Sequence, residues 1–151
     1  MYRQQAKENL MYRQQAREKL MQLFYQMDMN SDFSALQKEL FFENSEEWEK
    51  EQHYIENCIE IFLSHKDEID TKIKEASPKW NISRFSKVDL AILRLAICEL
   101  VYTDIPIQVA INEAVQLGKE FSNEEENKII NGILATVAKS GKVSEPRHLE
   151  N

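Results

Sequence analysis

The chain has 151 residues, which fits a single domain, and 42% of them are hydrophobic, which is enough to form a core. Only three glycines and three prolines occur, so the composition favours helices over strands and turns, and we expect an all-α protein. The net charge of −7 excludes a protein that coats nucleic acid by bulk charge, and the lack of a signal-peptide pattern or an apolar run of about 18 residues predicts a cytoplasmic protein without a membrane segment.

Charge is distributed unevenly along the chain. Residues 1–27 carry five basic and two acidic side chains, whereas residues 28–75 carry five basic and fourteen acidic ones. A weakly basic N-terminus on an acidic body can bind one short segment of nucleic acid, preferably with the help of a partner.

The chain begins with a direct repeat, in which MYRQQAKENL is followed at once by MYRQQAREKL, identical at eight of ten positions. A shift of ten residues rotates a helix by about 1000°, so the two copies cannot share one face. Only the second copy leads into an amphipathic pattern. We therefore predict that residues 1–10 are a duplicated extension, either a helical overhang or a basic arm using Arg3 and Lys7, and that the domain spans 11–141.

The first helix has an apolar stripe that fixes the directions of its other side chains. The stripe consists of Ala16, Leu20, Leu23, Phe24 and Met27. At 100° per residue, Tyr25 and Met21 then point away from the core, and Arg17 lies on the flank. An exposed tyrosine and methionine beside an arginine are typical of a contact surface, so a partner site is expected here.

Shorter helices follow. Ser31 or Asp32 is expected to cap a helix ending at Phe41, and an acidic loop covers residues 43–51. Two further helices are expected, one ending at about Ser64 and one ending at Ala76. Their predicted buried residues, and those that anchor the entry to the next helix, are Trp48, Ile55, Cys58, Ile59, Phe62, Ile69, Ile73, Trp80, Ile82 and Phe85.

The stretch from Arg84 to Phe121 predicts the core of the protein. Between Val88 and Tyr102 the only charged residues are Asp89, Arg94 and Glu99, which point in different directions, so this helix is expected to be buried. Ser86 and Asp89 match the capping-box pattern, which predicts a start at about Lys87. Ile105-Pro106 ends this helix and a second apolar helix begins. Cys58 and Cys98 lie in apolar runs and are expected to be buried free thiols.

Ser122 or Asn123 is expected to cap the last helix. Its predicted buried residues are Ile130, Ile133, Leu134 and Val137. Gly132 inside it predicts the close approach of a neighbouring backbone, and Gly141 predicts a stop, followed by a tail over residues 142–151.

The sequence contains no recognisable catalytic or metal-binding motif. His53, His65 and His148 lack metal-ligand spacing, and no P-loop or nucleophile elbow is present. The pair Asn112-Glu113 lies between apolar positions and is expected to be structural. We therefore expect no enzyme, no metal and no cofactor.

Residues 88–134 combine VAINEAV, a K-x-F and an N-G-[IV]-L in one stretch, and AREKLMQLFYQ precedes them near the N-terminus. This combination resembles the NusB family of bacterial transcription antitermination factors. The resemblance implies about six to seven helices in two packed subdomains. It also implies binding of boxA-type RNA as a heterodimer with the ribosomal protein NusE, in an antitermination complex on RNA polymerase. Some members self-associate through the RNA-binding surface, so a homodimer is a further expectation.

Individual residues follow from the resemblance. In the family's arginine-rich segment, Arg13 matches the start and Arg17 the A-R-E ending, but Gln14 and Gln15 replace frequent arginines. The resemblance places Tyr25 toward NusE.

The resemblance also assigns residues nearer the C-terminus. Asp89 is expected on the NusE side, and Glu125 and Lys128 near the RNA surface. The implied RNA-binding set is thus Arg13, Arg17, Glu125 and Lys128, and the partner-binding set is Met21, Tyr25 and Asp89.

Two alternatives remain open. One is the helical RNA-recognition domain that is fused to some ribosomal RNA methyltransferases, although a methyl-donor domain is missing here. The other is a protein-interaction adaptor without RNA contact, which Gln14, Gln15 and the acidic body favour.

Overall fold

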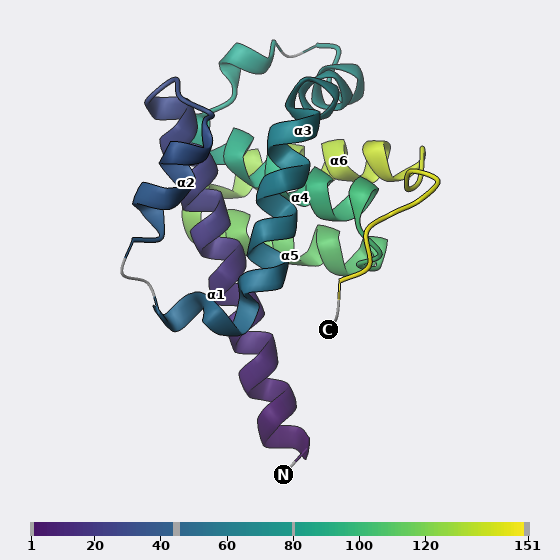
Figure 1. The fold of residues 1–151 in the computed structure, drawn as a ribbon. Coiled ribbons are helices and arrows are strands. Elements are labelled where there is room, and N and C mark those ends of the chain that lie inside the picture. The colour runs from purple at the N-terminus through teal and green to yellow at the C-terminus, as the bar shows by residue number, and fades with distance from the viewer. Residues whose placement is uncertain (1, 44–45, 80, 150–151) are drawn as a thin grey trace.

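The computed structural model describes residues 2–43, 46–79 and 81–149, and this part of the chain is helical almost throughout. Its elements are α1 (Tyr2–Met29), α2 (Ala35–Phe41), the 3₁₀ helix η1 (Glu46–Glu51), α3 (Gln52–Ala76), the 3₁₀ helix η2 (Ile82–Arg84), α4 (Lys87–Tyr102), α5 (Ile107–Phe121) and α6 (Glu124–Ala138). Figure 1 shows the first turns of α1 projecting beyond the body of the molecule. Trp80 and the side chain of Trp48 lie outside the described residues. Within the described part, no helix has both the length and the apolar character to cross a membrane.

The helix α4 lies at the centre of the fold. All residues from Asp89 to Tyr102 are buried, which confirms the prediction from its nearly all-apolar sequence. It packs against α1, α3, α5 and α6, so it joins the helices that precede it in the chain to those that follow it. The helix begins at Lys87, where the Ser86 hydroxyl accepts a hydrogen bond from the Asp89 amide at 3.0 Å, as the capping box predicted.

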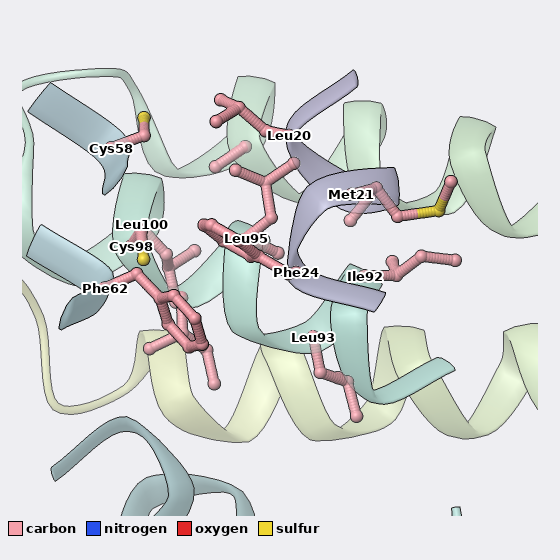
Figure 2. Close-up of a cluster of buried hydrophobic side chains, with 14 of the residues drawn as sticks. Leu20, Met21, Phe24, Cys58, Phe62, Ile92, Leu93, Leu95, Cys98 and Leu100 are labelled. Atoms are coloured by element: carbon pink, nitrogen blue, oxygen red, sulfur yellow. The ribbon is translucent and has the colours of Figure 1, made fainter. Parts of the chain in front are cut away.

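Aromatic and aliphatic side chains of α1, α3 and α4 fill the core, as Figure 2 shows. The rings of Phe24 and Phe62 stack with their centroids 4.0 Å apart. Cys58 and Cys98 are buried and free, as expected, and burial raises the pKa of both thiols, so they remain protonated and apolar.

Charged side chains enter this core only with partners. Arg94 of α4 donates to Asp70 of α3 at 2.9 and 3.0 Å and to Asp28 of α1 at 3.3 Å. Arg94 is therefore held in ion pairs that join α4 to both α1 and α3.

Of two predicted helix boundaries, one is wrong and one is confirmed. The cap of α2 is Ser34 rather than Ser31 or Asp32, because the Asp32 carboxylate instead accepts the Ser34 amide at 3.0 Å and forms the turn before the helix. The predicted division at about Ser64 is confirmed, because α3 consists of two helical parts joined by a kink at His65, which leaves the helical region at φ −123° and ψ 19°. The His65 ring stacks on Tyr102 of α4 at 4.4 Å, so tertiary packing holds the bent helix together.

The prediction that a neighbouring backbone approaches Gly132 closely is wrong. A Cβ there would meet no heavy atom of the described residues within 4 Å. Gly118 of α5 has that role instead, since a Cβ there would overlap the amide of Asn127 on α6. The same amide donates to the Val115 carbonyl at 3.1 Å, so α5 and α6 meet at these positions.

The C-terminal segment of residues 142–149 lies against the end of α4. The ammonium of Lys142 donates to the carbonyls of Leu100 and Ile105 at 3.0 and 2.7 Å, which satisfies acceptors that the helix end leaves free. The Arg147 amide donates to the Tyr102 carbonyl at 2.9 Å, and Leu149 is buried. The segment predicted as a tail is thus attached to the body along its described length.

Candidate nucleic-acid and partner interface

A groove with two cavities separates the N-terminal half of α1 from α5. The larger cavity, of about 650 Å³, is lined by residues that include Ala6, Asn9 and Arg13 of α1, Lys50 and Tyr54 beside them, and Val109 of α5. The smaller one, of about 410 Å³, is lined by Met11, Gln14 and Glu18 of α1 and by Asn112 and Gln116 of α5, among others. Arg17 and Glu113 line both cavities, so their ion pair at 3.6 Å lies where the two cavities meet.

Arg17 is buried in the floor of this groove, so the prediction that it lies exposed on the flank is wrong. Its guanidinium donates three hydrogen bonds of 2.9 to 3.1 Å to the Glu99 carboxylate of α4, and the Tyr54 hydroxyl donates to the same carboxylate at 2.8 Å. Burial opposes the charge of Arg17, but Glu99, Tyr54 and Glu113 together more than offset it, so the pKa of Arg17 is raised. The physical reason for the error is that Glu99, on a buried helix, requires a cation.

Arg13 lies at the wall of the larger cavity. Its Nε donates to the Glu51 carboxylate at 2.8 Å, and its guanidinium stands 4.2 Å from the centre of the Tyr54 ring. Only about 12% of the side chain is exposed. The predicted RNA-binding arginines are therefore brought together around Tyr54, but each is already held by a carboxylate.

The predicted partner residues of α1 divide into one that is exposed and one that is not. Tyr25 is 37% exposed, in agreement with its predicted direction, and Met29 one turn later is 53% exposed. Met21 is only 4% exposed and lies with Ile92 in the buried cluster of Figure 2, so its predicted outward direction is wrong. The reason is that α2, α3 and α4 all pack on α1, which widens its buried arc beyond the predicted stripe.

Asp89, which was expected on the partner side, is buried, with 2% of the residue exposed. The Ser122 hydroxyl lies 2.6 Å from its carboxylate and 3.0 Å from that of Glu126. Burial and the neighbouring Glu126 carboxyl raise the pKa of Asp89 to about 6, whereas the hydrogen bond between them lowers the pKa of Glu126. This polar cluster joins the start of α4 to the junction of α5 and α6. The exposed residue beside it is Glu125, which lines a cavity of about 240 Å³ together with Asp89.

Lys128 is exposed on α6 and lines a separate cavity of about 410 Å³. Lys119, Glu124 and the three asparagines Asn123, Asn127 and Asn131 line the same cavity, so two ammonium groups, three amides and one carboxylate border it. Glu125 and Lys128 thus border different cavities on the two sides of the first turns of α6.

Comparison with known proteins identifies the family. The model of the NusB family matches residues 14–139, which is most of the chain. The chain belongs to the NusB family. It is 44% identical over 120 residues to the transcription antitermination protein NusB of Acetivibrio thermocellus, covering 79% of this chain and 83% of that protein. It is 40% identical over 119 residues to the protein of the same name from Bacillus mycoides, covering 78% and 89%.

Solved NusB structures share the fold. The structure of T. maritima NusB superposes with a TM-score of 0.76 at 29% identity, over 85% of this chain and 92% of that one. A complex of the antitermination factors NusB and NusE with dsRNA has the same fold, with a TM-score of 0.72 at 24% identity, over 85% and 97%. The match to the NusB family model begins at residue 14, so the first copy of the repeat lies before the matched region.

Sequence reasoning missed the partners that fix the arginines, namely Glu51, Tyr54 and Glu99. A signal for Glu99 was available, because an acidic residue on a buried NusB helix must be compensated. No comparable signal marks Tyr54, which becomes the centre of the site only when α3 packs against α1.

Proposed function

We propose that this protein is a transcription antitermination adaptor that binds boxA-type single-stranded RNA together with the ribosomal protein NusE and joins the antitermination complex on RNA polymerase. Membership of the NusB family over residues 14–139 is the observation that carries the proposal. The exposed Tyr25 and Met29 on α1 support a partner surface at that helix, since aromatic and methionine side chains are enriched where proteins bind each other.

The geometry supports a joint rather than a solitary RNA contact. Arg13 and Arg17 are committed to Glu51 and Glu99, so few unpaired cations face the groove to attract phosphates. Single-stranded RNA also needs stacking and base-edge contacts, which a second protein can supply. We therefore expect weak binding of RNA by the chain alone and much tighter binding with NusE.

A direct test titrates the protein against a labelled boxA RNA and follows the fluorescence anisotropy. The control is an RNA with the same bases in scrambled order, and both are measured with and without NusE at two salt concentrations. The expected result is a sequence preference that grows when NusE is present. Equal affinities for both oligonucleotides, with NusE as without it, would contradict the proposal.

The interaction-only adaptor remains the second candidate, and the pairing of both arginines is the observation that favours it. In that case NusE would bind and RNA would not. A parallel titration of labelled NusE with the chain reports the partner contact without RNA, so NusE binding in that titration without RNA binding in the first would favour the interaction-only adaptor.

Tyr25→Ala tests the partner surface. A tyrosine at the centre of an interface costs about 2 kcal/mol or more when it is truncated, or roughly 30-fold in affinity. We expect that loss in the NusE titration. Val143→Ala, at a side chain of similar exposure (38% against 37%) on the C-terminal segment, is the matched control and should leave the affinity unchanged.

The proposal places the protein in the cytoplasm, assigns it no catalytic role and leaves a homodimer as an alternative state. It divides the chain into an extension at residues 1–10, the NusB domain at 11–141 and the C-terminal segment at 142–151. Turnover of any substrate that depended on Glu113, which is paired with Arg17, would count against it.

A further inference from the structure

The first copy of the repeat continues α1 for more than two turns beyond the part of the helix that packs on the body. Among the described side chains of residues 3–9, all are exposed except Glu8, which is half-buried. The extension is nevertheless part of the groove, because Ala6 and Asn9 line the larger cavity. Figure 1 shows this segment at the lower end of α1, away from α2 and from the far end of α3.

The two cations of the extension point along the same side of the helix as the groove. At 100° per residue, Arg3 and Lys7 both lie within about 20° of the direction of Gln14. The side chain of Gln14 lines the smaller cavity between α1 and α5. Arg3 and Lys7 are about 6 Å apart along the axis, at 1.5 Å per residue, and form a short basic row leading into the groove.

Arg3 and Lys7 differ from their counterparts in the second copy because they do not hold the fold together through ion pairs. Over the part of the chain that the structure describes, neither Arg3 nor Lys7 has an ion pair or a side-chain hydrogen bond, whereas the Gln4 amide of the same segment donates to the Glu8 carboxylate at 3.4 Å. Arg13 and Arg17, at the equivalent positions, are held by Glu51 and Glu99. The duplication therefore repeats the two cationic positions in a place where their charges remain available.

We propose that residues 3–9 bind the backbone of single-stranded RNA, with Arg3 and Lys7 contacting phosphates and directing the strand into the groove between α1 and α5. This inference rests on the proposed function. Residues 3–9 contain no large apolar side chain, which disfavours a protein interface, and their amides at Gln4, Gln5 and Asn9 are suited to base edges. The added contacts replace those that Gln14 and Gln15 remove from the second copy.

The test compares the full chain with the double variant Arg3→Gln/Lys7→Gln, each with NusE and a labelled boxA RNA, from about 0.1 to 1 M salt. Each phosphate contact to a single strand contributes about 0.7 to the slope of log K against log salt, so two lost contacts lower the slope by about 1.4. If affinities converge at 1 M salt, binding at 0.1 M weakens by about 25-fold. Circular dichroism checks that the helix content is unchanged.

The matched control is Lys74→Gln/Lys79→Gln, which removes the same charge from two exposed lysines, one in the last turn of α3 and one three residues beyond that helix. An unchanged slope in the first variant, or an equal loss in both variants, would overturn the inference while leaving the proposed function intact, since the full chain still binds. Tighter binding by the first variant would overturn it as well, because the extension would then shield the groove. A full chain that fails to bind boxA RNA with NusE would instead reject the proposed function itself.

Discussion

Residues 2–10 and 12–20 have nearly the same sequence and lie on the same helix, yet they differ in almost every physical property. In the second copy Ala16 and Arg17 are buried, and Arg13 is largely covered. In the first copy their counterparts Ala6, Lys7 and Arg3 are exposed. The difference arises because the packing partners of α1, which are η1, α2, α3 and α4, cover the body part of the helix and leave its first turns free.

The comparison shows which part of the stability of α1 comes from its neighbours. Local helix propensity is nearly the same in both copies, because they differ only at Lys7/Arg17 and Asn9/Lys19, so it cannot account for their different environments. Most helical stability in proteins comes from packing rather than from propensity. The same substitution in the two copies therefore measures the tertiary contribution alone, with the local sequence held nearly constant.

The largest expected difference is between Arg17→Ala and Lys7→Ala. Arg17→Ala leaves the Glu99 carboxylate buried without its cation, and breaking such a pair costs about 3–5 kcal/mol of unfolding free energy. Lys7→Ala is a surface change and should stay within about 0.5 kcal/mol. Urea denaturation followed by circular dichroism measures both values.

Similar losses of unfolding free energy in the two variants would contradict this prediction, because the buried ion pair would then add nothing to the stability of the second copy. If Arg17→Ala does not fold, Arg17→Lys serves instead. It keeps the charge but loses the bidentate geometry toward Glu99, so it should lie between the wild type and a complete loss.

A smaller difference is expected when a leucine is inserted at the two alanines. Ala16 has no exposed surface, so Ala16→Leu forces extra volume into a packed core and costs about 1–3 kcal/mol. Ala6 borders a cavity, and Ala6→Leu should change the unfolding free energy by less than about 0.5 kcal/mol. The midpoints of thermal unfolding give the ranking, and a reversed ranking would show that the first copy, not the second, is packed.

The central helix pair was predictable because its signals are local. Ser86 and Asp89 define the start of α4, Pro106 separates it from α5, and the nearly all-apolar run between them predicts burial. Tyr25 was also predictable, because a single residue opposite a long stripe stays outside even when that stripe widens.

The surroundings of Arg17, Met21 and Asp89 were not predictable from one helix at a time. For Arg17 and Met21 on α1, and for Asp89 at the start of α4, the position of a second or third helix decides between core and surface. Glu99 meets Arg17 only because α1 and α4 pack together, and Asp89 is covered only because Ser122 lies at the junction of α5 and α6. Helical periodicity gives directions around one axis but not the placement of the other axes.

The smallest stability difference is expected between Arg13→Gln and Arg3→Gln, and it should reverse when RNA binding is measured. Arg13→Gln removes a partly exposed ion pair with Glu51 and a cation–π contact with Tyr54, together worth about 1–2 kcal/mol, whereas Arg3→Gln should be neutral. In the RNA titration with NusE, Arg3→Gln should lower the salt slope by about 0.7, because its charge is free to meet a phosphate. Arg13→Gln should lower the slope less, since Glu51 already neutralises that charge in the folded protein. If the same variant caused the larger change in both the unfolding free energy and the salt slope, the two copies would not divide structural and binding roles between them.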